Sequence, residues 1–229
     1  GENVTVINGT PTRSGFTFSG WNSVANGTGT VYTAGSTFAI GNTSVTLYAQ
    51  WVALPSNNST ITDADGNLYT TVVIGNQIWT VENLRTTKYN DGTAIPTSLD
   101  STTWDNLTTP GYCFYNNNTS ESEKQKWGAL YNWYAVNTNK LSPIGWRIPS
   151  DNDWTTLQNF LISNGFNYDG TTTGNKIAKS LAALSDWTSS SNTGEIGRYL
   201  NLNNRTGFSA LPSGNRLNGS FRDRYRDGI

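Results

Sequence analysis

The first fifty residues alternate between apolar and polar side chains in short runs separated by glycine. Two runs, GFTFSGW (15–21) and VTLYAQW (45–51), place an aromatic or aliphatic residue at nearly every second position. A period of two residues is typical of a strand with one buried face, and Asn-Gly between such runs indicates tight turns. The segment therefore predicts a small unit of short strands over residues 1–52.

A linker and a longer second region follow this unit. Residues 53–60 lie in a stretch rich in proline, serine and asparagine without periodicity, which is typical of a linker. Two apolar runs then flank Gly75 and Asn76, which predicts a β-hairpin. The second domain is expected to cover residues 61–229.

Three stretches of this second domain have the three-to-four-residue period of an amphipathic helix. The first begins at Ser120, with Glu123 as a capping-box partner, and the second begins at Ser150, with Asp153 in that role. The apolar positions expected to face the core are Trp127, Leu130, Tyr131, Tyr134, Trp154, Leu157, Leu161, Ile177, Leu181 and Leu184.

The regions around these helices complete the expected fold. A strand is predicted to end at Ile148, because Pro149 cannot continue it. After the third helix the chain becomes rich in asparagine, glycine and arginine, which predicts a loop region anchored at Phe208, Leu211 and Phe221. Strands and helices together predict an α+β fold.

Composition narrows the class of function. With 15 basic and 16 acidic residues, the chain lacks the broad positive field of a nucleic-acid binder. No apolar run reaches the roughly 20 residues of a membrane helix, so we expect no membrane insertion in this segment. Its 9 Trp and 11 Tyr offer surfaces for sugar stacking, but most fall at positions expected to be buried, which favours core packing.

Candidate catalytic and metal-binding groups have simpler structural explanations. The chain has no histidine, so ordinary catalytic triads and the commonest metal ligand are missing. Asp151 and Asp153 could form the carboxylate pair of a glycosidase, but they are expected at a helix N-terminus, where the helix dipole favours negative charge. Asp63 and Asp65 could begin a calcium loop, but an Asp-Gly turn explains them better. Cys113 lies in a strand-like run, which predicts a buried, inert thiol. We therefore expect no catalytic residue, no metal and no cofactor.

Charge is concentrated at the end of the chain, in NRLNGSFRDRYRDGI (215–229). These charges are explained either as a soluble terminus or as a contact surface, because arginine and tyrosine are enriched at binding hot spots. In the second interpretation Phe221 is a buried anchor. The predicted ligand-binding residues are Arg216, Asn218, Arg222, Asp223, Arg224, Tyr225, Arg226 and Asp227.

Residues 1–52 resemble the InlB B-repeat, also called the Listeria–Bacteroides repeat. The resemblance rests on PTRSGF (11–16), on Gly20-Trp21 and on the VTLYAQW run. It implies a β-grasp-like spacer in a bacterial surface protein.

Residues 61–229 resemble the Fibrobacter succinogenes major paralogous domain. The resemblance is carried by TDADGNLYTTVVIGNQIWTVENLRTTKYNDGT (62–93), GWRIPSDNDW (145–154) and TGFSALPSG (206–214). It implies a C-type-lectin-like domain, related to the fold of formylglycine-generating enzymes. Many relatives carry a cysteine at the position of Ser142, which implies an unpaired Cys113 here, and relatives also continue into a further strand, which implies truncation at the C-terminal strand.

The C-terminal residues also resemble the variable region of diversity-generating retroelement proteins. Together these resemblances favour a non-catalytic extracellular module at the bacterial cell surface, an adhesin or variable protein that binds a protein or glycan on another cell or virus. Two alternatives stay open, a structural stalk or fibre subunit and an enzyme of the formylglycine-generating type. The paired cysteines of that enzyme chemistry are missing, so we expect no enzyme activity.

Overall fold

The computed structural model describes residues 2–8, 11, 13, 16–41, 43–53, 59–97 and 100–225. The chain divides into two compact units, residues 1–56 and 57–229, which are described separately. Both helices and strands are present, so the α+β prediction is confirmed.

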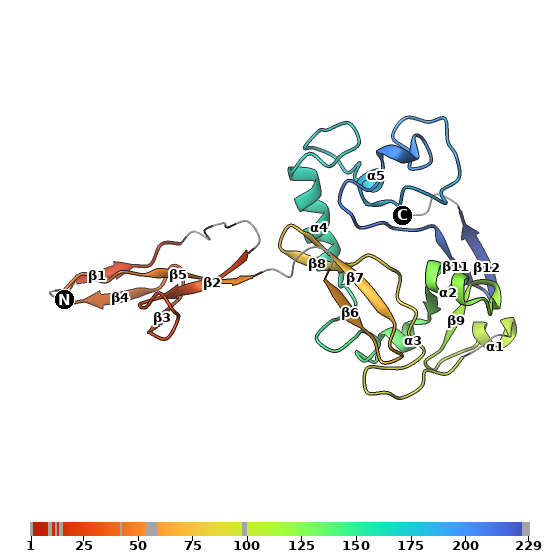
Figure 1. The fold of residues 1–229 in the computed structure, drawn as a ribbon, viewed down its shortest axis with the longest axis horizontal. Helices are drawn as coiled ribbons and strands as arrows, with labels where there is room; N and C mark the ends of the chain where they lie inside the picture. The colour runs from red at the N-terminus through yellow and green to blue at the C-terminus, as the bar shows by residue number, and fades with distance from the viewer. Residues whose placement is uncertain are drawn as a thin grey trace. The chain divides into compact units, whose positions relative to one another are not determined.

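The N-terminal unit is built from antiparallel strands (Figure 1). Strand β1 (Glu2–Thr5) pairs with β4 (Thr37–Ile40), and β2 (Phe16–Asn22) lies between β3 (Val31–Tyr32) and β5 (Tyr48–Ala53). All regular structure described between residues 2 and 53 is strand, as the two-residue period predicts.

Aromatic contacts and one buried amide hold this unit together. The Phe18 ring lies 5.3 Å from that of Trp21 on the same strand and 5.7 Å from that of Trp51 on β5. The buried Asn22 side chain donates to the carbonyls of Gly27 and Gly29 at 3.1 and 3.0 Å. A single asparagine thus fixes the loop after β2.

The C-terminal unit contains a three-stranded antiparallel sheet. Its strands β6 (Thr60–Thr62), β7 (Leu68–Ile74) and β8 (Gln77–Thr80) follow one another in space as in sequence. Ile74 pairs with Gln77, so Gly75 and Asn76 form the two-residue turn of the predicted hairpin, which is confirmed.

Helix α4 (Asp151–Ser163) packs against this sheet and forms the main core with it. Its capping box between Ser150 and Asp153 is present as predicted. Leu157 and Leu161 are buried against the sheet; the other buried members of this core are Val72, Ile74, Trp79, Ile177 and Leu181.

The remaining elements are short and surround this core (Figure 1). Strands β9 and β10 form one antiparallel pair, and β11 and β12 another. The elements are α1 (Ser101–Asp105), β9 (Tyr112–Phe114), η1 (Tyr115–Asn117), α2 (Glu121–Trp127), β10 (Ala129–Tyr131), α3 (Trp133–Val136), α5 (Ala178–Leu181), η2 (Leu200–Leu202), β11 (Ser213–Leu217) and β12 (Ser220–Arg224).

Two predicted helices are wrong in extent. The first was expected to continue past Trp127 through Leu130 and Tyr134, but α2 ends at Trp127 because the next residues pair with β9. Its predicted capping box is absent, since Ser120 makes no side-chain capping bond. The third helix ends at Leu181, because the chain there bonds to Ala210 instead: the Leu181 carbonyl accepts from the Ala210 amide at 2.9 Å, and the Ala183 amide donates to the Ala210 carbonyl at 2.8 Å. Leu184 is therefore exposed.

Two further predictions near α4 are wrong. Trp154 was expected in the core but remains 45% exposed, because its ring covers the side of the core, 4.7 Å from Trp79 and 6.1 Å from Phe208. The strand expected to end at Ile148 is absent from the described residues 141–150, which pair with no strand.

The packing of α4 gives a direct test of the core. Leu161 is 0% exposed, whereas Leu184 is 54% exposed. Leu161→Ala should lower the free energy of unfolding by about 2 to 5 kcal/mol, because it leaves a cavity against the sheet. Leu184→Ala should change it by less than about 0.5 kcal/mol. Urea unfolding followed by Trp fluorescence measures both, and an equal loss in the two variants would contradict this packing.

Candidate functional site

The arginine-rich terminus folds into a β-hairpin and not into a loop. Strands β11 and β12 pair antiparallel from Ser213↔Arg224 to Leu217↔Ser220. The turn residues Asn218 and Gly219 both have positive φ, 49° and 66°, as a two-residue hairpin turn requires. A Cβ atom at Gly219 would lie 2.6 Å from the Ser101 carbonyl oxygen, so the turn rests directly on the start of α1.

Arg216 points to the inner face of the hairpin, against aromatic rings. Its guanidinium carbon lies 4.7 Å from the centroid of Trp104 and 4.7 Å from that of Phe221. Its Nε also donates to the Gly219 carbonyl at 3.3 Å. Phe221 packs in turn on Tyr115, with ring centroids 5.3 Å apart, so it is the anchor that the sequence predicts.

Arg224 is held even more closely. Its side chain is only 10% exposed, its guanidinium lies 4.2 Å from the Trp127 ring and 5.1 Å from the Tyr115 ring, and its Nη2 donates to Glu123 Oε2 at 2.5 Å. This hydrogen bond lowers the pKa of Glu123. Arg216 and Arg224 thus attach the hairpin to the domain.

The opposite face of the hairpin is exposed. We call the exposed residues Asn215, Asn218, Arg222, Asp223 and Tyr225 the outer face. The Tyr225 ring is exposed on one side and also packs edge-on against Trp127, with ring centroids 5.4 Å apart. Asn215 pairs with Arg222, so their side chains lie on the same side, and Asn215 Nδ2 donates to Asp223 Oδ2 at 2.9 Å. The Arg222 side chain makes no hydrogen bond or ion pair with any residue that the structure describes.

The eight predicted site residues therefore fall into three groups. Asn218, Arg222, Asp223 and Tyr225 lie on the outer face. Arg216 and Arg224 lie inside, where they contact the rest of the domain. Arg226 and Asp227 lie outside the described residues.

Other polar candidates from the sequence are used within the fold. Asp63 accepts hydrogen bonds from the Asp65 and Asn67 amides, both at 2.9 Å, as the predicted Asp-Gly turn requires. Asp65 forms an ion pair with Lys88 at 3.2 Å. Cys113 is an unpaired, buried thiol, and burial raises its pKa. Within the described ranges, no three Asp, Glu or Cys side chains lie close enough to hold a metal ion.

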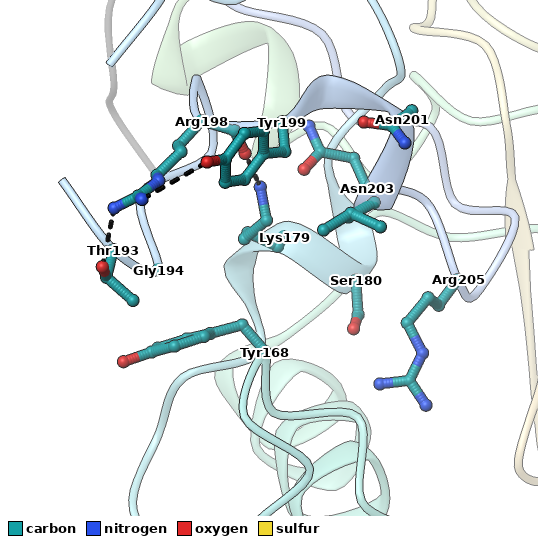
Figure 2. Close-up of a pocket in the computed structure, with 11 residues that line it drawn as sticks. Tyr168, Lys179, Ser180, Thr193, Gly194, Arg198, Tyr199, Asn201, Asn203 and Arg205 are labelled. Carbon is teal, nitrogen blue, oxygen red and sulfur yellow. Dashed lines mark hydrogen bonds between the residues drawn. The ribbon is translucent and has the colours of Figure 1, made fainter. Parts of the chain in front are cut away.

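A pocket that the sequence did not predict lies beside α5 (Figure 2). We call it the α5 pocket. Its volume is about 440 Å³. Its side chains come from three separate segments, and the principal ones are Tyr168, Lys179, Arg198, Tyr199, Asn203 and Arg205.

Lys179 fixes one wall of the α5 pocket. The side chain is buried, and its Nζ donates to the backbone carbonyls of Glu195, Ile196 and Arg198 at 3.2, 3.3 and 2.5 Å. Burial lowers the pKa of this ammonium group. Lys179 therefore fixes the loop before η2, because three of its carbonyl groups point at the ammonium group. Figure 2 shows the hydrogen bond to the Arg198 carbonyl.

Arg198 and Tyr199 form the upper wall of the pocket in Figure 2. Arg198 Nη1 donates to the Ser191 carbonyl at 2.8 Å and to Thr193 Oγ1 at 2.7 Å, and its guanidinium lies 4.9 Å from the Tyr199 ring. The same loop reaches the hairpin, because the Thr188 amide donates to the Tyr225 carbonyl at 2.9 Å. The pocket and the hairpin thus share one loop.

A second cavity of about 480 Å³ lies beside β8. Its two charged side chains, Arg147 and Asp153, form an ion pair with each other, and Asp153 also caps α4. These charges are used by the fold, so this cavity is the weaker candidate for recognition.

Comparison with known families assigns both units. Residues 72–228, more than half of the chain, match the model of the Fibrobacter succinogenes major domain. The chain belongs to this family. Residues 1–50 match the Listeria-Bacteroides repeat domain, so this repeat precedes the Fibrobacter succinogenes major domain in the chain. The resemblances of the two units to these two families are therefore confirmed.

Two curated proteins of Evansella cellulosilytica are similar to short parts of the chain. A predicted Gly-rich membrane protein is 51% identical over 39 residues, which is 17% of this chain and 4% of that protein. A predicted membrane protein is 41% identical over 51 residues, which is 22% of this chain and 7% of that protein. The chain thus spans less than a tenth of either relative, and the matches fit a bacterial cell-surface protein.

Two further findings complete the comparison. No solved structure matches the chain significantly. Among the helices that the structure describes, none combines the length and the hydropathy of a membrane span.

The two faces of β12 give a matched pair of variants. Arg224→Ala should lower the free energy of unfolding by about 1 to 3 kcal/mol, because it removes contacts with several aromatic rings. Arg222→Ala should change it by less than about 0.5 kcal/mol, because this side chain is exposed. Chemical denaturation of both variants measures the difference. If Arg222→Ala were as destabilising as Arg224→Ala, the division into an inner and an outer face would be wrong.

Proposed function

We propose that this chain is a non-catalytic recognition module of the bacterial cell surface. Its outer face would bind a protein or glycan on another cell or virus, while the repeat acts as a spacer. The observation that carries the proposal is the division of the hairpin, in which Arg216 and Arg224 are fixed inside and Arg222, Asp223 and Tyr225 are exposed.

The residue types of the outer face support recognition. Arginine and tyrosine are enriched at binding hot spots, and asparagine and aspartate add hydrogen-bonding groups. The hairpin is also fixed before binding, by Arg224 on Trp127 and by the turn on Ser101. A fixed surface loses little conformational entropy on binding, which favours affinity.

The architecture of the major domain is consistent with a C-type-lectin-like fold, which is part of the proposal. A helix, α4, packs on a small sheet, and a long irregular segment, residues 182–212, connects α5 to β11. In such a fold the irregular region and the terminal strands would form the ligand-binding surface.

The proposal predicts that binding depends on the outer face. The full chain should bind a subset of targets in a screen of intact bacterial cells and immobilised glycans. Replacing both Arg222 and Tyr225 with Ala should reduce that binding at least about tenfold, because it removes the two side chains most suited to a hot spot. Arg13→Ala, an exposed arginine of the N-terminal unit, is the matched control and should bind as the unchanged chain does.

The same screen separates the alternatives. Equal binding by all three chains would show that the outer face is not the site. Light scattering at several concentrations tests the stalk or fibre alternative, which predicts self-association that the double variant abolishes. A monomer that binds a foreign target supports recognition.

We also propose that the outer face is a diversified surface of the retroelement type. Exposed side chains can vary without loss of the fold, whereas the inner ones cannot. Sequences of this locus from many isolates should therefore vary at Asn215, Asn218, Arg222, Asp223 and Tyr225. They should retain Arg216, Phe221 and Arg224. Variation spread evenly along the hairpin, or no variation at all, would argue against diversification.

A further inference from the structure

We propose that the α5 pocket is a second binding site, and that its ligand is a sugar that carries a carboxylate, such as a hexuronate. The site is separate from the outer face, so the inference does not rest on the proposed function of the hairpin. Three features carry it: two exposed tyrosine rings, an excess of positive charge, and a buried amide oxygen without a partner.

The tyrosine rings offer flat apolar surfaces at the pocket. Tyr168 is 42% exposed although its ring is held against the backbone of Gly194. A Cβ atom at Gly194 would lie 2.4 Å from that ring, so only glycine fits there, and its φ of 89° also favours glycine. Tyr199 is exposed on the other side (Figure 2). Rings fixed in this way are suited to the apolar face of a pyranose.

The charge of the pocket favours an anion. Lys179, Arg198 and Arg205 line it, and no acidic side chain does so in the described chain. Lys179 and Arg198 use most of their donors in the fold, as shown above. Among the described residues the Arg205 side chain makes one hydrogen bond, from Nη1 to the Gly165 carbonyl at 3.2 Å, and its guanidinium lies 5.1 Å from the Phe166 ring centroid. The rest of its guanidinium fork can receive a carboxylate.

Asn203 supplies a hydrogen-bond acceptor that the protein does not use. The residue is buried, and its Nδ2 donates to the carbonyls of Ala183 and Ile196 at 3.0 and 3.2 Å. These bonds set the orientation of the amide, and they leave Oδ1 buried without a partner in the described structure. An unmatched buried acceptor is costly, and a small shift of the side chain that brings it against a ligand hydroxyl group would remove that cost.

These features together select the ligand class. A carboxylate matches Arg205, a hydroxyl matches Asn203, and a flat ring matches Tyr168. A neutral sugar would leave the cations unmatched, and an inorganic anion would leave the tyrosine rings unused. The volume of about 440 Å³ is in the range of small-molecule sites.

The test is a titration of the full chain, labelled with ¹⁵N, with sodium glucuronate, followed by ¹H–¹⁵N correlation spectra. Glucose at the same concentrations and sodium chloride at the same ionic strength are the ligand controls. We expect saturable shifts at the amides of Tyr168, Gly194 and Asn203 with glucuronate, and binding at least about tenfold weaker with glucose, because a charge-assisted pair is lost.

Variants assign the binding to the pocket. Tyr168→Ala and Arg205→Gln should each weaken glucuronate binding at least about tenfold. Tyr134→Ala is the matched control, because Tyr134 is also 42% exposed but does not line the pocket, and its affinity should not change. The spectra also show whether each variant remains folded. The double variant of Arg222 and Tyr225 should bind glucuronate normally, which separates this site from the hairpin.

Three results would overturn the inference. One is the absence of saturable shifts with glucuronate. Another is equal affinity for glucose and glucuronate, which would exclude the role of the carboxylate. The third is unchanged affinity in the folded Tyr168→Ala variant.

Discussion

Two arginine side chains stacked on aromatic rings determine how the end of this chain is displayed. Arg216 lies between Trp104 and Phe221, and Arg224 lies on Trp127 beside Glu123. Arg216 and Phe221 point inward as a cross-strand pair, so Asn215 and Arg222 beside them point outward. Gly214 and Asp223 have positive φ, 74° and 62°, which interrupts the alternation, so Arg224 also points inward although it lies two residues after Arg222. The outer face, the proposed contact surface, follows directly from this arrangement.

The arginines of the C-terminal hairpin have two different roles. A guanidinium can stack on a ring while its edge donates hydrogen bonds, so it serves as a partly buried anchor as well as a contact group. Arg224 is such an anchor, stacked on Trp127, whereas the exposed Arg222 side chain has no partner among the described residues and is suited to a contact. From the composition of the terminus alone, Arg222 and Arg224 are assigned to the same binding surface. The pocket beside α5 repeats the pattern, since Arg198 supports the loop and Arg205 keeps free donors.

Local patterns predicted the features that local energies decide. The Gly75-Asn76 hairpin and the capping box of α4 depend on residues close in sequence. The predictions were wrong where a segment distant in sequence takes hydrogen bonds that the local pattern assigns to a helix. Leu184 continues a helical pattern, but the Leu181 carbonyl and the Ala183 amide bond to Ala210 and end the helix. The α5 pocket could not be predicted, because Tyr168, Lys179 and Arg205 meet only through the tertiary fold.

Amide hydrogen exchange of residues 213–224 tests the central claim most directly. If Arg216 and Arg224 anchor the hairpin, its cross-strand amides should be protected to an extent similar to those of β7 and β8, because both would open only when the domain unfolds. Exchange of the hairpin at the rate of an unfolded peptide, with β7 and β8 still protected, would show a frayed terminus and would contradict the account.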